Sequence, residues 1–159
     1  MLRKEYASAA EHFRNARQSD PRNMTYLVEE AKAWFFAEDY DEVIDILQGP
    51  MRRKKGKWEA KLTAYRLYGG AFDMQEKYNA ARKIFRKGLR EYPRSGELYL
   101  ELGILEAGLQ NETAALLHWE QGMRVAPELA DNYLLAAQVL ERRGNLLWSI
   151  IYLEQFLTL

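Results

Sequence analysis

The sequence predicts an all-α fold built from antiparallel helix pairs, and three observations lead to this prediction. Residue types recur at an offset of 34 residues, and a period of roughly 20–50 residues is typical of repeat arrays. Between the recurrences, apolar residues follow the three- and four-residue spacing of one helix face. Pro21, Pro93 and Pro127 each follow such a run, and proline cannot continue a helix. Nothing alternates with period two for long enough to suggest a strand.

Six positions carry the repeat. In one unit they hold Tyr65, Gly69, Ala81, Phe85, Gly88 and Pro93, and 34 residues later they hold Tyr99, Gly103, Ala115, Trp119, Gly122 and Pro127. Small residues allow paired helix axes to approach closely, and large aromatic residues fill the space between units. We therefore assign these aromatic side chains to packing rather than to a ligand site.

Nine helices are expected in chain order. The first covers about residues 4–18, and pairs follow at about 23–37 and 40–48, 57–73 and 76–91, 95–108 and 111–124, and 129–143 and 145–158. The turns within the pairs are short, so the partner helices must run antiparallel. Gly49 and Pro50 are expected to end the third helix, since glycine favours a helix end and proline stops a helix.

This spacing resembles the tetratricopeptide repeat (TPR) family, whose unit is a 34-residue helix–turn–helix. The resemblance covers essentially the whole chain and implies a right-handed superhelix of antiparallel pairs, a TPR-like α-solenoid. It divides a single array into a half repeat at 1–23, a degenerate repeat with an insertion at 24–61, repeats at 62–95 and 96–129, and an apolar C-terminal repeat at 130–159. The unit 24–61 matches least well, because its closing proline is missing.

Composition argues against several classes of function. The 23 basic and 23 acidic residues balance, whereas nucleic-acid binders usually have a basic excess. No apolar run reaches the ~18–20 residues of a membrane span. Without cysteine there is no disulfide or zinc–thiolate site, and His12 and His118 are expected to be ordinary helix residues.

We also expect no enzymatic activity and no cofactor or metal, since a phosphate-binding glycine loop, a His-Glu-x-x-His motif and a nucleophile elbow are all lacking. The sequence leaves the compartment open. It fits a cytoplasmic protein, or a periplasmic or secreted protein from which a signal peptide has been removed.

The resemblance implies that the first helix of each pair lines a concave groove that binds a protein or peptide. The candidate groove residues are Val28, Lys32, Phe35, Phe36, Arg66, Met74, Leu100 and Ile104, and Asp73 is also expected to face inward. The positions of the family's carboxylate clamp hold Val28, Lys32, Leu67, Gly70, Glu97 and Glu101. Only one of them is basic, so an apolar partner segment, extended or helical, is favoured over an acidic tail. The alternative is that neighbouring helices cover these apolar residues.

The C-terminal segment 146–159 is apolar nearly all round, and Glu154 is its only charged side chain. A terminal helix of a free-standing array needs a polar outer face. Leu147, Trp148, Ile151 and Tyr152 are therefore candidates for an oligomer or stacking surface. Three explanations stay open: further repeat units, a homodimer seam, or a docking surface for a partner. The chain is thus either an adaptor with a binding groove or an architectural, self-associating segment of a longer TPR protein.

The loop before the fourth helix carries the basic run 52–57. Such a run can contact acidic protein, lipid headgroups or nucleic acid, or act as a nuclear localisation signal. Because the net charge is zero, the favoured interpretation is a solvated loop.

Overall fold

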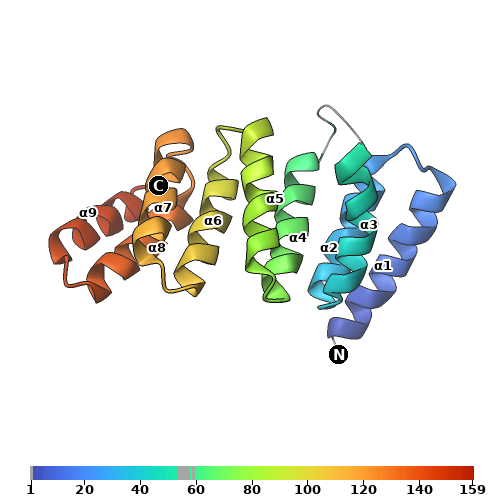
Figure 1. Cartoon of the computed structure of the whole chain (residues 1–159), viewed down its shortest axis with the longest axis horizontal. Coiled ribbons are helices and arrows are strands. Elements are labelled where there is room, and N and C mark those ends of the chain that lie inside the picture. Colours follow the sequence, from blue (N-terminus) through green and yellow to red (C-terminus); the bar gives the residue numbers. More distant parts are fainter. Residues whose placement is uncertain (1, 54–57, 59) are drawn as a thin grey trace. The chain divides into compact units, whose positions relative to one another are not determined.

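The computed structural model describes residues 2–53, 58 and 60–159, and over these residues the protein consists of nine α-helices without strands (Figure 1). The helices are α1 (Leu2–Ser19), α2 (Met24–Phe36), α3 (Tyr40–Arg53), α4 (Lys61–Met74), α5 (Tyr78–Glu91), α6 (Gly96–Gly108), α7 (Glu112–Val125), α8 (Ala130–Arg142) and α9 (Leu146–Leu157). The predicted all-α class and helix order are confirmed. Most boundaries lie within two residues of the sequence prediction.

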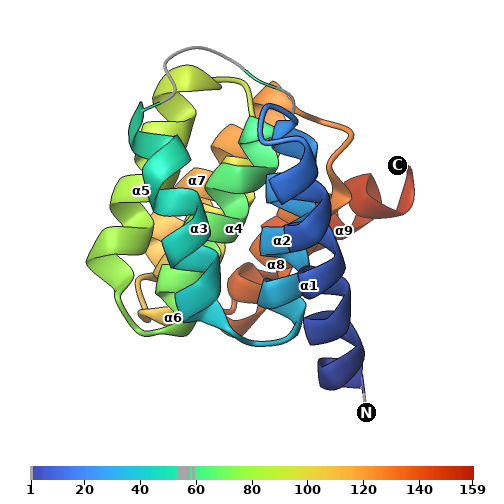
Figure 2. The same ribbon diagram turned by 90° about the vertical axis from the view of Figure 1, so that its right-hand side faces the viewer.

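The chain forms two compact units, residues 1–84 and 85–159. In the first unit α2 packs against α1, α3 and α4, and α3 packs against α4. Figure 2 shows α1 lying alongside α2. In the second unit α6 packs against α7 and α8, α7 against α8, and α8 against α9. The consecutive helices from α1 to α4 and from α6 to α9 are therefore also neighbours in space.

Four of the turns between helices have the same backbone geometry. Glu38, Glu76, Gln110 and Gly144 adopt left-handed φ angles of 60°, 59°, 61° and 72°. In the first turn the Asp39 amide donates to the Trp34 carbonyl and the Glu38 amide donates to the Phe35 carbonyl, each at 3.0 Å. These two bonds define the Schellman motif that ends a helix. The equivalent bonds recur in the other three turns, so the helices α2, α4, α6 and α8 end in the same way.

The prediction that Gly49 and Pro50 end the third helix is wrong. The α3 helix continues to Arg53 with Pro50 inside it. A proline this close to the end of a helix removes one hydrogen bond of the last turns. Met51, only 4% exposed, lies in the extra turn, and its burial offsets that loss. The following helix correspondingly begins at Lys61, later than the expected residue 57.

Three of the four aromatic residues at the repeat positions are buried, as the sequence predicts, whereas Tyr99 is only partly buried. Tyr65, Phe85 and Trp119 are at most 2% exposed. The core of the second unit includes a cluster of Leu100, Ala115, Leu116, Trp119, Met123, Tyr133, Ala136, Val139 and Leu140. Tyr65, Phe85 and Trp119 are thus unavailable to a ligand, and a binding site must use other residues.

Candidate functional site

The first unit presents a partly apolar surface formed by one face of α2 and one face of α4, which we call the α2–α4 face. It comprises Lys32, Phe35 and Phe36 of α2, Gly70, Asp73 and Met74 of α4, and Tyr6 of α1. On each helix these residues follow the spacing i, i+3, i+4, which places them on one side. The two helices pack against each other in the unit, so their faces form one continuous surface.

Aromatic side chains of α1 and α2 form the centre of the α2–α4 face. Phe36 is 50% exposed, and its ring centroid lies 5.3 Å from that of Tyr6 and 6.4 Å from that of Phe35. Phe35 in turn packs edge-on against Tyr40 at 5.3 Å. Aromatic pairs at these distances stabilise each other, so the exposed ring of Phe36 is held in position rather than free to rotate away.

Gly70 joins α4 to this aromatic group. A Cβ atom on Gly70 would stand 3.2 Å from the ring of Phe35, closer than most side-chain contacts. The absence of a side chain therefore lets Phe35 lie close to the backbone of α4. Met74, one turn further along α4, is 56% exposed. The α2–α4 face thus has an aromatic centre, with one exposed apolar side chain on each helix, Phe36 on α2 and Met74 on α4.

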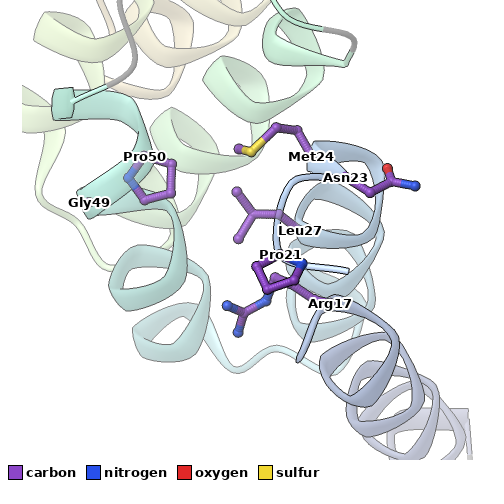
Figure 3. Close-up of a pocket in the computed structure, with 7 residues that line it drawn as sticks. All are labelled: Arg17, Pro21, Asn23, Met24, Leu27, Gly49 and Pro50. Carbon is purple, nitrogen blue, oxygen red and sulfur yellow. The ribbon is translucent and has the colours of Figure 1, made fainter. Parts of the chain in front are cut away.

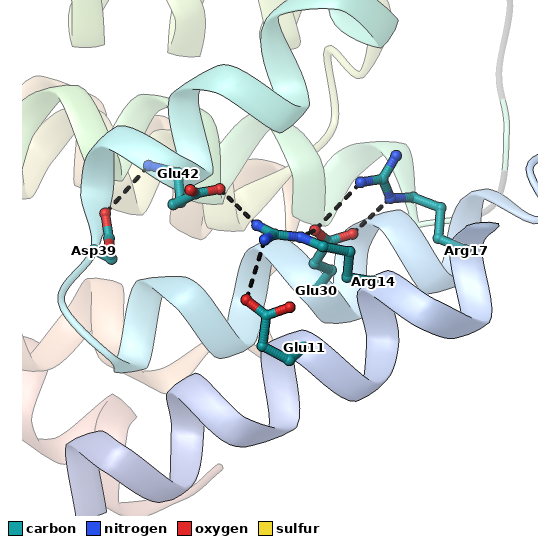
Figure 4. Close-up of polar contacts among 6 residues, drawn as sticks. All are labelled: Glu11, Arg14, Arg17, Glu30, Asp39 and Glu42. Atoms are coloured by element: carbon teal, nitrogen blue, oxygen red, sulfur yellow. Dashed lines mark hydrogen bonds and ion pairs between the residues drawn. The ribbon is translucent and has the colours of Figure 1, made fainter.

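A buried ion network fixes α1, and with it Tyr6, against α2 and α3 (Figure 4). The Glu30 side chain is fully buried and accepts hydrogen bonds from Arg14 Nε at 3.1 Å and Arg17 Nε at 2.5 Å. Arg14 also donates to Glu42 of α3 at 2.7 Å. Arg14 and Arg17 of α1 therefore both bind the carboxylate of Glu30 in α2. The sequence analysis did not predict this network. The sequence signal for it was the i, i+3 spacing of Arg14 and Arg17, which places both arginines on the same face of their helix.

Asp73 is the one acidic residue of the α2–α4 face. Its side chain is partly buried, and burial raises the pKa of its carboxyl group above the ordinary value. Among the described residues its carboxylate has no hydrogen-bond or ion-pair partner. The charged groups at the adjoining elements are engaged elsewhere: Lys77 donates to Gln75 Oε1 at 2.8 Å, and Gln75 donates to Asp41 Oδ1 at 2.8 Å.

Two of the predicted groove residues do not reach the surface. Val28 is 1% exposed, and Leu100 is 7% exposed and belongs to the core of the second unit. Val28 and Leu100 each lie at least one turn before the exposed end of their helix, in a part of the helix that a neighbouring helix covers. Lys32 is exposed and lies 3.7 Å from Glu29, while Arg66 is only partly exposed.

In the second unit the equivalent face of α6 is smaller. Ile104 is 42% exposed, and Gly108 has open space around its backbone. Arg142, at the end of α8, pairs with Glu112 of α7 at 3.0 Å. This face therefore offers one exposed apolar side chain and has no counterpart of the aromatic group of the first unit.

The C-terminal helix α9 exposes much of its apolar surface. Leu147 and Trp148 are 68% and 50% exposed, whereas Ile151 and Tyr152 are partly buried. The Tyr152 hydroxyl donates to Glu120 at 3.3 Å, and its ring packs edge-on against Tyr133. Burial, together with the nearby Glu120, raises the pKa of Tyr152. Tyr152 thus belongs to the core side of α9 and is no part of an outer surface.

Besides Leu147 and Trp148, the exposed surface of α9 includes residues that the sequence prediction did not single out. Leu146, Ile150 and Leu157 are 60%, 53% and 79% exposed. With the partly exposed Leu153 they follow the spacing four, three, four, which is the apolar seam of a coiled coil. The spacing was visible in the sequence, but every side of this helix is apolar. In the structure the core side is marked by the buried Ser149 and by Tyr152 and Phe156, which pack against the core of the second unit.

A pocket of about 310 Å³ opens near the start of α2 (Figure 3). Its wall consists of Arg17, Pro21, Asn23, Met24, Leu27, Gly49 and Pro50. The wall is mainly apolar, and Arg17 is bound to Glu30. The pocket lies at the end of α2 opposite to Phe36, so it is separate from the aromatic group of the α2–α4 face.

Other features bear on metals, membranes and the basic run. Within the described residues, no cluster of three or more His, Cys, Asp or Glu side chains could hold a metal ion. None of the helices there combines the length and the apolarity needed to cross a bilayer. Residues 54–57 of the predicted basic loop lie outside the described residues.

Antiparallel helix pairs of this length, joined by the same turn after the first helix and with small residues at the helix contacts, are characteristic of the TPR fold. The crystal structure of MamA superimposes with a TM-score of 0.77 at 17% identity, over 98% of this chain and 88% of that chain. TTC0263, a thermophilic TPR protein of Thermus thermophilus, gives 0.78 at 16% identity over 96% and 82%. YrrB, described as a TPR protein with an unusual peptide-binding site, gives 0.65 at 15% identity over 98% and 78%. No family model matches the sequence.

Proposed function

We propose that this protein is a non-catalytic interaction scaffold that binds an extended or helical segment of another protein, with the α2–α4 face as its principal contact. The observation that carries this proposal is the half-exposed ring of Phe36, held between Tyr6 and Phe35. Exposed aromatic rings that are fixed in position are typical anchors of protein interfaces. The likeness to YrrB, whose description includes a peptide-binding site, supports the proposal at the level of the fold.

The mode of binding follows from the character of the face. It is apolar at its centre and carries few charges, so it suits an apolar stripe of a partner helix or alternate side chains of an extended segment. In the second unit the exposed Ile104 is a separate and smaller apolar contact. The acidic tails bound by a carboxylate clamp do not suit the α2–α4 face, because Lys32 is its only basic residue.

A displayed library of random 16-residue peptides, selected on the full chain, tests the proposal. Binding of the selected peptides is then measured by fluorescence anisotropy on the unmodified chain and on the variants Phe36→Ala and Leu117→Ala. Leu117 is 56% exposed but lies on α7, so it is a matched control. We expect Phe36→Ala to weaken binding at least about tenfold, as loss of an aromatic anchor does, and Leu117→Ala to change it less than about twofold. If no selected peptide depends on Phe36, the proposed function is wrong.

The exposed apolar side of α9 supports a second function, in which the protein is an architectural unit that self-associates through this helix. Leu146, Ile150 and Leu157 expose more than half of their surface, and burying each is worth roughly 1.5–3 kcal/mol. Glu154 is the only charge of the segment, so a second copy of α9 would meet little repulsion. Stacking within a longer TPR array would cover the same side.

Light scattering after size exclusion tests this second function. We expect the unmodified chain to form a dimer at micromolar concentration and Ile150→Glu to be monomeric. Gln155→Glu adds the same charge to an exposed position of the same helix and should leave the dimer intact. A monomer at every concentration would rule out self-association through α9.

A further inference from the structure

We propose that the segment bound at the α2–α4 face carries a lysine or arginine next to its apolar anchor, and that this cation pairs with the carboxylate of Asp73. The inference rests on the proposed function and adds to it the chemistry of the partner. It begins from the position of Asp73, three residues after Gly70 and directly before Met74. One side of α4 therefore carries the close contact with Phe35, the acid and the exposed methionine.

The environment of Asp73 is unfavourable for a carboxylate in the free protein. The side chain is partly buried, and a buried charge without a partner costs free energy. Asp73 also lies in the last turn of α4, where the partial negative charge of the helix terminus repels an anion. Its own carbonyl accepts the Glu76 amide at 2.8 Å in the Schellman turn, so the residue is held at this place.

No group of the described chain relieves this cost. The Asp73 carboxylate has no hydrogen-bond or ion-pair partner there. Lys77 and Asp41 are both hydrogen-bonded to Gln75, and Lys32 lies near Glu29. Arg3, on the same side as Tyr6, donates to the Ala37 carbonyl and pairs with Glu38 at 3.4 Å. The cationic side chains around the face thus have other partners, which leaves Asp73 to a cation from outside.

The surroundings of Asp73 select the kind of cation. An inorganic ion would need several oxygen ligands, and Asp73 is the only acid on this face. Lysine and arginine have long apolar stems that can lie on the rings of Phe35 and Phe36 while the charged end reaches the carboxylate. In the partner, one apolar residue would pack on Phe36 and Met74, and the lysine or arginine would follow at a fixed spacing. That spacing would be two residues in an extended segment and three or four residues in a helix.

The anisotropy assay with selected peptides tests this pairing on the full chain. Each Phe36-dependent peptide is synthesised with its lysine or arginine and with glutamine in that place, and both are titrated against the unmodified chain, Asp73→Asn and Asp45→Asn. Asp45 is an exposed acid of α3, so its variant controls for the change in net charge. We expect Asp73→Asn to weaken binding of the basic peptide about tenfold, in the range of desolvated interfacial charge pairs. It should leave the glutamine peptide unaffected, and Asp45→Asn should change neither.

Each other outcome contradicts the inference. Phe36-dependent peptides without a basic residue, or equal effects of Asp73→Asn on the two peptides, would overturn the pairing and leave the groove function standing. Peptides that do not depend on Phe36 would overturn both. Circular dichroism of Asp73→Asn serves as the folding control. We expect its melting temperature to be equal to or above that of the unmodified chain, because the variant removes an unpaired charge.

Discussion

A Cβ atom on Gly103 would stand 2.1 Å from the indole Nε1 of Trp119, so the tryptophan ring lies directly against the backbone of α6. The same indole nitrogen donates to the Leu100 carbonyl at 3.3 Å. These contacts give the repeated glycine a physical role, since the fully buried ring of Trp119 occupies the place where any other side chain at residue 103 would be.

The substitution Gly103→Ala should therefore destabilise the protein by about 2–3 kcal/mol, as overpacking of a core does. Its matched control is Gly108→Ala on the same helix, where no heavy atom lies within 4 Å of the added carbon. The control should be neutral or slightly stabilising, because alanine favours helix more than glycine does. Urea unfolding followed by circular dichroism measures both. Equal effects of the two substitutions would mean that Trp119 moves away without cost.

The ion network of Glu30 leads to a second prediction. Glu30→Ala should lower the free energy of unfolding by about 2–4 kcal/mol, because removing one member of a buried ion pair leaves the other members without compensation. The side chains of Arg14 and Arg17 are 27% and 33% exposed. Water can therefore partly solvate the two arginines after Glu30 is removed, which keeps the loss of stability below the largest values seen for buried ion pairs. Glu11→Ala is the control, since Glu11 contacts Arg14 with 52% of its side chain exposed and should contribute less than about 1 kcal/mol.

Loss of the Glu30 network should also loosen α1. Hydrogen exchange measured by mass spectrometry would then show faster exchange in residues 2–19 of Glu30→Ala than in the unmodified chain. Uniform acceleration across the first unit, without preference for α1, would contradict the specific role of this network.

The repeated left-handed turns allow a stabilising substitution. Gln110 adopts a φ angle of 61°, which costs a residue with a side chain about 1–2 kcal/mol relative to glycine. Gln110→Gly should raise the free energy of unfolding by about 0.5–1 kcal/mol after the larger entropy of glycine in the unfolded chain is included. Gly144, at a φ angle of 72° in the equivalent turn, supplies the reverse test, since Gly144→Ala should lower stability by a similar amount. If Gln110→Gly were destabilising, a side-chain contact of Gln110 would outweigh the backbone strain.

Asp73 makes stability depend on pH. Burial raises the pKa of its carboxyl group in the folded protein above 3.8, so between the two pKa values the folded state binds more protons than the unfolded state. Stability from this group therefore falls as the pH rises through that interval. We expect the unmodified chain to lose more stability than Asp73→Asn between about pH 4 and pH 7. Urea unfolding at several pH values measures the difference, and parallel pH profiles would show that Asp73 is solvated in the folded state.

The sequence by itself determined the secondary structure and the pairing of the helices. The recurrence of Tyr65, Gly69 and Phe85 at Tyr99, Gly103 and Trp119 was sufficient, because residues that must pack in every unit repeat with the unit. The same logic assigned these aromatics to the core, where the structure places Tyr65 and Trp119. The sequence did not predict the extension of α3 beyond Pro50. Gly49 and Pro50 are a local signal for the end of a helix, whereas the burial of Met51 depends on contacts with other parts of the fold.

The tertiary structure decided which apolar residues stay at the surface and which charges lack partners. Val28 and Phe36 share one predicted face, yet one is 1% and the other 50% exposed, since coverage by a neighbouring helix changes along the length of α2. Asp73 and Glu30 are both acids of helices in one unit, but only Glu30 lies opposite two arginines. Periodicity follows from the geometry of one helix, whereas exposure and ion pairing depend on the helices beside it.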